Sequence, residues 1–211
     1  MADRRLEMLT DIRSRIQIEP GRVVVMAARV FCPEPIGAGP REISSVDEHA
    51  RVPGGRVLPI WLDDTAAVEI VTWNTGEASD LRRYGNLTHA EKQFVRFMGD
   101  RAFTRVEVEI SHSPCTACAT MLASWLKEAR QKGRVVTQQP NRREGRRVYL
   151  GARVVRDPEI PAILRWGQLY TTPPQATGWP AIKELYDAGW RLAAPGTELP
   201  NGSGDVPVVL L

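Results

Sequence analysis

The chain contains 211 residues, of which 43% are hydrophobic, 25% charged and 7% aromatic, and its formal net charge is +3. This composition is typical of one folded domain with a core of its own, and it excludes a disordered, collagen-like or coiled-coil chain. No apolar run approaches the ~20 residues of a membrane span, and the first residues lack the apolar segment of a signal peptide. Three cysteines are too few for a disulfide framework, so we expect a single domain over residues 1–211 in a reducing compartment.

The N-terminal half predicts one helix and two strands. Residues 3–17 place apolar side chains at three- and four-residue spacings, which predicts an amphipathic helix. The valine-rich segment 22–31 predicts a strand, and residues 66–73 predict a second strand that can pair with it as a hairpin. Residues 33–59 between them are dense in proline and glycine and have no period, so we predict a long connector or insertion there.

The C-terminal half alternates helices and strands. In chain order we predict a helix over 89–100, a strand over 106–110, a helix from Pro114 to near Gly133, a strand over 147–155, helices over 160–169 and 181–188, and a short strand over 191–194. Residues 133–146 and 169–180 are predicted to be further insertions. The order α-β-β-α-β-α-β-α-α-β predicts helices layered on one sheet, which is an α/β sandwich.

The positive charge is concentrated in one segment. Nine basic residues and a single acid, Glu144, lie between Arg130 and Arg156, so this segment carries +8 and the remainder of the chain −5. Guanidinium groups pair with phosphate in a bidentate manner, so the segment suits a polyanion such as a nucleic acid. A solvated loop is the alternative interpretation.

Two short motifs concentrate the reactive side chains. The first is His89-Ala90-Glu91, and the second is Pro114-Cys115-Thr116-Ala117-Cys118, with 22 residues between Glu91 and Pro114. Either motif alone is weak evidence, because a lone Cys-x-x-Cys can be a redox pair or part of a core. Together they match the H-x-E and P-C-x-x-C signature of zinc deaminases, and chance coincidence of core residues is the alternative.

The spacing of the second motif suits a metal site. Cys115 and Cys118 lie three residues apart, so both sulfurs project from one face of the first turn of a helix, where the helix dipole favours a thiolate. With His89 as third ligand, three protein ligands leave the fourth tetrahedral position open for water, as in catalytic zinc sites. A structural zinc would need a fourth ligand, for which the candidates are Cys32, His49 and His112.

Glu91 is the candidate catalytic residue. It lies two positions beyond the first ligand, so its carboxylate can sit beside the metal without binding it. There it can take a proton from the attacking water and deliver it to the ring nitrogen and then to the leaving amine.

Beyond these motifs, four segments resemble the AID/APOBEC polynucleotide cytidine deaminases. Thr88 to Met98 is similar to their zinc helix with H-[AV]-E-x-x-F, and Ser111 to Cys118 is similar to their S-W-S-P-C-x-x-C, with His112 in place of the tryptophan. Residues 148–155 resemble their fourth strand, and residues 182–189 the helix that follows it. The resemblance covers about residues 66–195, and bacterial deaminase toxins share the same core.

The resemblance implies a cytidine deaminase-like α/β/α sandwich with a mixed sheet of about five strands flanked by helices. It implies conversion of cytosine to uracil in a polynucleotide, and a Zn²⁺ ion held by His89, Cys115 and Cys118. We expect DNA over RNA as the substrate, and the insertions leave open whether it is single-stranded DNA, duplex DNA or another nucleic acid. The substrate contacts that the resemblance implies are Asn74 at the sugar, Thr88 in the pocket, the Ala90 N–H at the base carbonyl, His112 and Ser113 near the base, and Arg156 in the loop after the fourth strand. Asn74 as a turn residue and His112 as an ordinary loop residue stay open.

The loop before the first motif offers further contacts. Tyr84 is placed for stacking on a base, and Arg82 and Arg83 beside it can contact phosphates.

Two other function classes remain open on the sequence. One is a deaminase of free nucleosides or nucleotides, or of RNA, and the other is a zinc-stabilised nucleic-acid-binding module with an idle centre. We expect a monomer without a membrane partner, located in the cytoplasm, or delivered into a target cell if the chain is a toxin. In that last case an immunity protein is an expected partner.

Overall fold

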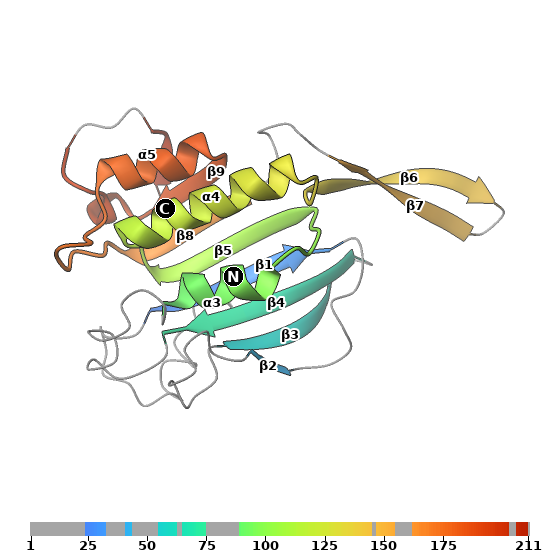
Figure 1. The fold of residues 1–211 in the computed structure, drawn as a ribbon, viewed down its shortest axis with the longest axis horizontal. Helices are drawn as coiled ribbons and strands as arrows, with labels where there is room; N and C mark the ends of the chain where they lie inside the picture. Colours follow the sequence, from blue (N-terminus) through green and yellow to red (C-terminus); the bar gives the residue numbers. More distant parts are fainter. Residues whose placement is uncertain are drawn as a thin grey trace.

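The computed structural model describes residues 24–32, 41–43, 55–62, 65–74, 89–144, 147–154, 162–202 and 206–210. The helix predicted over 3–17 lies outside these residues. Within them the fold is α/β, with helices packed on a mixed sheet (Figure 1), so the predicted fold class is confirmed at this level.

The main sheet has eight strands in the order β10-β9-β8-β5-β1-β4-β3-β2. One half is antiparallel and consists of β1 (Val25–Phe31), β2 (Arg41–Ile43), β3 (Gly55–Leu62), β4 (Thr65–Trp73) and β5 (Arg105–His112). The central strand β1 pairs with β4, so that Val25 lies opposite Trp73, which confirms the predicted hairpin partners. They are not consecutive in the chain, because β2 and β3 lie between them.

The other half of the sheet is parallel. It consists of β8 (Ala162–Gln168), β9 (Trp190–Ala194) and β10 (Val208–Leu210), which continue the sheet from β5. Parallel neighbours require crossover connections, and α5 (Trp179–Asp187) makes the one between β8 and β9. Six strands are five residues or longer and two edge strands have three, so the expectation of about five strands was too low.

Three helices, α3 (Ala90–Met98), α4 (Thr116–Gln131) and α5, lie on one face of this sheet (Figure 1). Strand side chains alternate between the two faces, so Met26, Ala28 and Val30 of β1 share the core with the helices. Trp125 of α4 belongs to this core. The centroid of its ring lies 5.3 Å from the ring centroid of Phe94 and 5.2 Å from that of Phe103. Burial of these apolar side chains stabilises the packing of α3 and α4 on the sheet. None of the helices in the described ranges combines the length and the apolar character that a membrane crossing requires.

One C-terminal strand is confirmed but lies outside the main sheet, and one predicted helix is wrong. The strand predicted over 147–155 exists as β7 (Arg147–Val154), but it pairs only with β6 (Val136–Glu144) in a separate two-stranded sheet that extends beyond the end of α4 (Figure 1). The segment 160–169, predicted to be helical, contains β8, which pairs with β5 in the main sheet. Its buried residues alternate, as in a strand, and pairing with β5 and β9 on both sides stabilises the extended form.

The predicted connector 33–59 also contains structure. It holds β2 and the first part of β3, which extend the antiparallel half of the sheet. Pro59 lies within β3, but β2 pairs with β3 only over Gly55–Val57, so at Pro59 only β4 is a partner. Proline is tolerated at such an edge position, which explains why the proline content did not prevent a strand.

Candidate metal centre

The metal centre is built at the beginnings of two adjacent helices. His89 is the N-cap of α3, and Cys115 is the N-cap of α4, with Cys118 one turn further along. The start of α3 is tied to the end of β4 by two buried hydrogen bonds. The Thr72 hydroxyl donates to the Ala90 carbonyl at 2.8 Å, and the Ala90 N–H donates to Asn74 Oδ1 at 3.1 Å.

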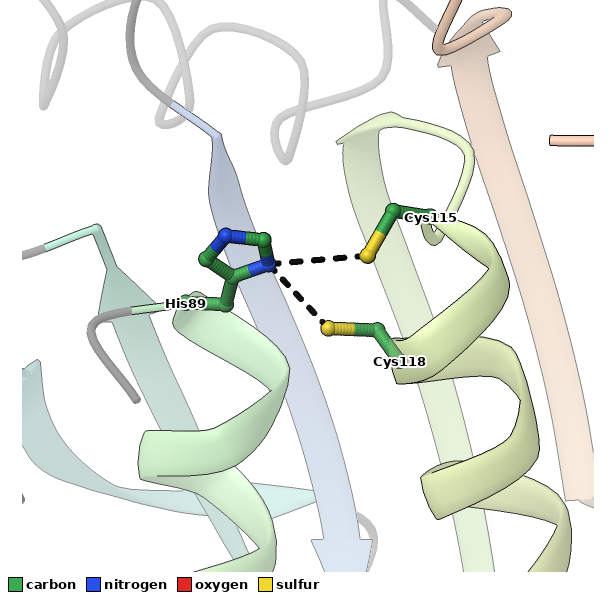
Figure 2. Close-up of side chains that lie close together, drawn as sticks. All are labelled: His89, Cys115 and Cys118. Atoms are coloured by element: carbon green, nitrogen blue, oxygen red, sulfur yellow. Dashed lines mark hydrogen bonds between the residues drawn. The ribbon is translucent and has the colours of Figure 1, made fainter. Parts of the chain in front are cut away.

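The three predicted ligands converge, as Figure 2 shows. His89 Nδ1 lies 3.2 Å from Cys118 Sγ and 3.7 Å from Cys115 Sγ, and the ligand atoms of all three residues lie within 4.8 Å of one another. A tetrahedral ion with metal–sulfur bonds of about 2.3 Å and a metal–nitrogen bond of about 2.0 Å would separate each nitrogen–sulfur pair by about 3.6 Å. The three residues therefore form a group that could hold a metal ion, and its dimensions and donor set are compatible with zinc.

The group has three members among the described residues. Cys32 and His112, the candidate fourth ligands that the structure describes, do not belong to it, and His49 lies outside the described residues. Cys32 is a buried free thiol at the end of β1. The described residues thus supply one imidazole and two sulfurs to the group.

The electrostatics of the group favour a metal-binding thiolate. The pKa of Cys115 is lowered to about 4, chiefly because the Cys118 thiol donates a hydrogen bond to its sulfur, with His89 and the Cys118 N–H adding to the effect. The pKa of Cys118 is raised because it is the donor in this pair and because it is buried. Burial alone would lower the pKa of His89, but the hydrogen bond to Cys115 and the negative charges of Glu91 and Cys115 outweigh it and raise the pKa. The two sulfurs thus share one proton, which a cation would displace.

Glu91 lies beside the ligands and is only 3% exposed. Burial raises the pKa of its carboxyl to about 7, although the nearby His89 opposes the shift, and the carboxyl also hydrogen-bonds with Cys118. A group with a pKa near the working pH can both accept and donate a proton, which is what general acid–base catalysis requires. The buried carboxyl of Glu91 therefore lies beside the three candidate ligands, and its role as a proton carrier stays a prediction.

The structure also places several of the predicted substrate contacts. Asn74 and Ala90, predicted to touch the sugar and the base, are hydrogen-bonded to each other, so together they position the start of α3. His112 is the last residue of β5 and is buried, with Nδ1 3.2 Å from Ser111 Oγ. Ser113 is 2% exposed. The predicted contacts outside the described residues are Arg82, Arg83, Tyr84, Thr88 and Arg156.

The loop that borders the metal centre is the connection between β8 and α5, residues 169–178. This loop follows β8, which pairs with β5, whereas Arg156, in the loop that the resemblance implied, lies outside the described residues. Its carbonyls accept hydrogen bonds from the N–H and the hydroxyl of Thr116 in the first turn of α4. Tyr170 and Thr177 of this loop are site residues that the motifs did not reveal. Only the prediction that residues 169–180 form an insertion pointed to them.

Neither a comparison with protein-family models nor a comparison with curated proteins returns a match for this chain. The conclusion at this level is a mixed α/β chain that brings His89, Cys115 and Cys118 together in a group able to hold a metal ion.

Proposed function

We propose that the protein is a zinc-dependent deaminase that hydrolyses cytosine to uracil in a polynucleotide, with DNA as the favoured substrate. The observation that carries the proposal is the convergence of His89 Nδ1 and the sulfurs of Cys115 and Cys118 next to the buried carboxyl of Glu91. A purely structural metal has no use for a buried carboxyl with a pKa of about 7 beside it. We also propose that the fold is of the cytidine deaminase-like kind, on the motifs that resemble that family.

The chemistry divides between the ion and the chain. A zinc ion held by these ligands supplies a Lewis acid that lowers the pKa of water toward ~7. The Glu91 carboxylate accepts a proton from the water that attacks C4 of cytosine, and it delivers this proton to ring atom N3. The hydroxyl group now on C4 gives up a second proton, which Glu91 passes to the exocyclic amine, so that the C4–N4 bond breaks, ammonia leaves and the C4 carbonyl of uracil remains. In the metal-free chain, burial raises the pKa of Glu91 to about 7, and a carboxyl that titrates near neutral pH can both accept and donate a proton.

A polynucleotide substrate is supported by charge. The segment between Arg130 and Arg156, which includes β6 and β7, carries +8 in a chain whose net charge is +3. Attraction of such a segment to phosphates is independent of sequence and weakens as salt rises. A free nucleoside carries no phosphate and gains nothing from this charge, so the basic segment favours a polymer over a free nucleoside.

The test is incubation of the zinc-loaded chain with matched single- and double-stranded DNA and RNA and with free cytidine. We expect C-to-U changes, detected by sequencing, in at least one polymer, and none with the Glu91→Gln variant. Conversion of free cytidine alone would contradict the polynucleotide assignment. Binding of nucleic acid without conversion of any substrate would instead identify a zinc-stabilised binding module.

A further inference from the structure

We propose that the hydroxyl groups of Ser113 and Thr177 form a directed hydrogen-bond relay that positions the β8–α5 loop at the metal centre, which makes Thr177 a positioning residue for substrate binding. The inference rests on the proposed function for its kinetic consequence. Its structural part, the position of the loop, is independent of any activity.

Each hydroxyl has one hydrogen to donate, and this decides which of the two side chains is the donor in the contact between them. Thr177 has one hydroxyl hydrogen, which it donates to the Pro114 carbonyl at 2.7 Å. The 2.8 Å contact between the two hydroxyls must therefore have Ser113 as donor and Thr177 as acceptor. Ser113 Oγ in turn accepts the N–H of Tyr170 at 2.8 Å. The chain runs from Tyr170 through Ser113 and Thr177 to Pro114, and each hydroxyl hydrogen has one acceptor.

The relay is shielded from water at both hydroxyls. Ser113 is 2% exposed and Thr177 is 6% exposed. Water cannot readily replace a hydrogen bond at this depth, so the loss of one hydroxyl leaves buried polar partners unsatisfied. Without these two hydroxyls, the loop in its present position would leave buried polar groups without hydrogen bonds, which raises its free energy.

The relay joins the two segments that border the metal centre. At one end it holds the carbonyl of Pro114, the residue before the ligand Cys115. At the other end it holds Tyr170, whose N–H is bound by Ser113 and whose carbonyl accepts the Thr177 N–H at 2.8 Å. Both backbone polar groups of Tyr170 are thus fixed by relay residues.

The Tyr170 side chain lies within electrostatic reach of the ligands. Burial first, and then the negative charges of Cys115, Cys118 and Glu91, raise the pKa of its phenol. Tyr170 is thus a half-buried residue near the candidate ligands, and its backbone is held by the relay.

The rest of the loop has its own attachments. The Ser113 N–H donates to the Gln168 carbonyl at 2.7 Å, and the Thr116 N–H and hydroxyl donate to the carbonyls of Gln175 and Ala176. These bonds survive the loss of the Thr177 hydroxyl, so the first turn of α4 keeps its cap and the two sulfurs keep their positions. Loss of the hydroxyl should therefore release Tyr170 without releasing the metal.

The test compares two substitutions in the full, zinc-loaded chain. Thr177→Val keeps the shape and removes the hydroxyl, whereas Thr177→Ser keeps the hydroxyl and removes the methyl group. With a cytosine-containing oligonucleotide, we expect Thr177→Val to raise KM by about tenfold with kcat within about twofold, and Thr177→Ser to stay within about twofold of the unmodified chain in both. Equal impairment of both variants, or an unchanged KM in Thr177→Val, would overturn the role of the hydroxyl. A fall in kcat that accompanies loss of zinc would overturn the assignment to substrate binding.

Hydrogen–deuterium exchange separates this inference from the proposed function. In Thr177→Val the amides of Tyr170 and Thr177 should exchange at least about tenfold faster, with zinc content unchanged. If no substrate is deaminated but this acceleration is seen, the proposed function fails and the relay stands as a device that positions the loop. If exchange over residues 169–178 is unchanged, the relay is overturned whatever the activity. Should Thr177→Val fail to fold, Ser113→Ala is the second variant, and it must accelerate exchange at the Tyr170 amide.

Discussion

The three cysteines of this chain occupy two environments that give the same thiol opposite properties. At the beginning of α4, the pKa of Cys115 is lowered to about 4, because the Cys118 thiol and N–H and the His89 ring all stabilise its negative charge. At the end of β1, burial raises the pKa of Cys32 to about 12, with only Arg101 opposing the shift. Both residues are 3% exposed.

The comparison shows that burial alone does not decide thiol chemistry. The two sites differ in the hydrogen-bond donors around the sulfur. Cys115 lies at a helix N-terminus beside a second thiol and an imidazole, whereas Cys32 lies in apolar surroundings. The group of His89, Cys115 and Cys118 could therefore hold a metal ion, whereas Cys32 is part of the core. Each of the following predictions tests one side of this contrast.

The largest effect is expected from loss of a ligand. Cys118→Ala should abolish stable metal binding and lower kcat by more than about a thousandfold, because two remaining ligands cannot hold a catalytic ion. Zinc per chain, measured after gel filtration, checks the first part. Cys32→Ala is the matched control and should retain zinc and activity. A Cys118→Ala chain that keeps one zinc per chain would place the metal elsewhere.

Removal of the proton carrier comes next. Glu91→Gln should lower kcat by about 10²- to 10⁴-fold, the usual contribution of a general acid–base group, with zinc content unchanged. The amide has the shape of the protonated carboxyl that burial favours, so the variant should also fold with little change in melting temperature. Steady-state kinetics on the best oligonucleotide is the measurement. Activity within tenfold of the unmodified chain would remove Glu91 from the mechanism.

A smaller, graded effect is expected in thiol reactivity. In the metal-free chain at pH 6, iodoacetamide should modify Cys115 at least about a hundredfold faster than Cys32, because only Cys115 is a thiolate there. Zinc should protect Cys115. Mass spectrometry of the alkylated peptides gives both rates in one experiment, and equal rates would mean that the two environments do not differ as described.

The smallest effect concerns stability at alkaline pH. The folded pKa of Cys32 lies above its unfolded value of 9.0, so the neutral thiol of the folded chain retains its proton after the unfolded chain has lost it. Stability is therefore fully present below pH 9 and falls as the pH rises toward 12, by about 1 kcal/mol at pH 10. Denaturant unfolding at pH 8 and pH 10 should show a shallower decline for Cys32→Ala. An identical decline would assign the alkaline loss to other groups.

The metal centre could be predicted from the sequence because its signals are local. His89 and Cys115 each lie at the start of a helix, and Glu91 and Cys118 follow within one turn of their motif partner. The sequence alone does not show that the two helices begin side by side. The resemblance to a known arrangement of motifs predicted it, and the structure brings the three residues together.

The errors concern features that depend on distant partners. The segment with Ala162, Leu164 and Trp166 buried at alternate positions has the period of a strand, but an apolar run this short is also compatible with a helix. Only its pairing with β5 and β9 decides between the two. In the same way, residues 147–154 form a strand, as predicted, but the sequence alone does not show that the partner is β6 instead of the main sheet.

Tyr170 and Thr177 had no signal of their own. They lie more than fifty residues beyond Ser113 and Pro114, and a threonine in a proline-rich loop resembles any other turn residue. Their position follows from the parallel register of β5 and β8, which brings the ends of both strands to the same edge of the sheet.

The most direct test of the central claim is X-ray absorption at the zinc edge of the full chain. The account predicts one zinc per chain with two sulfur neighbours at about 2.3 Å and two lighter neighbours at about 2.0 Å, one from His89 and one from solvent. Cys118→Ala should lose this signal, and Cys32→Ala should keep it. A shell of three or four sulfur atoms, or a shell that Cys118→Ala leaves unchanged, would contradict a catalytic centre at these residues.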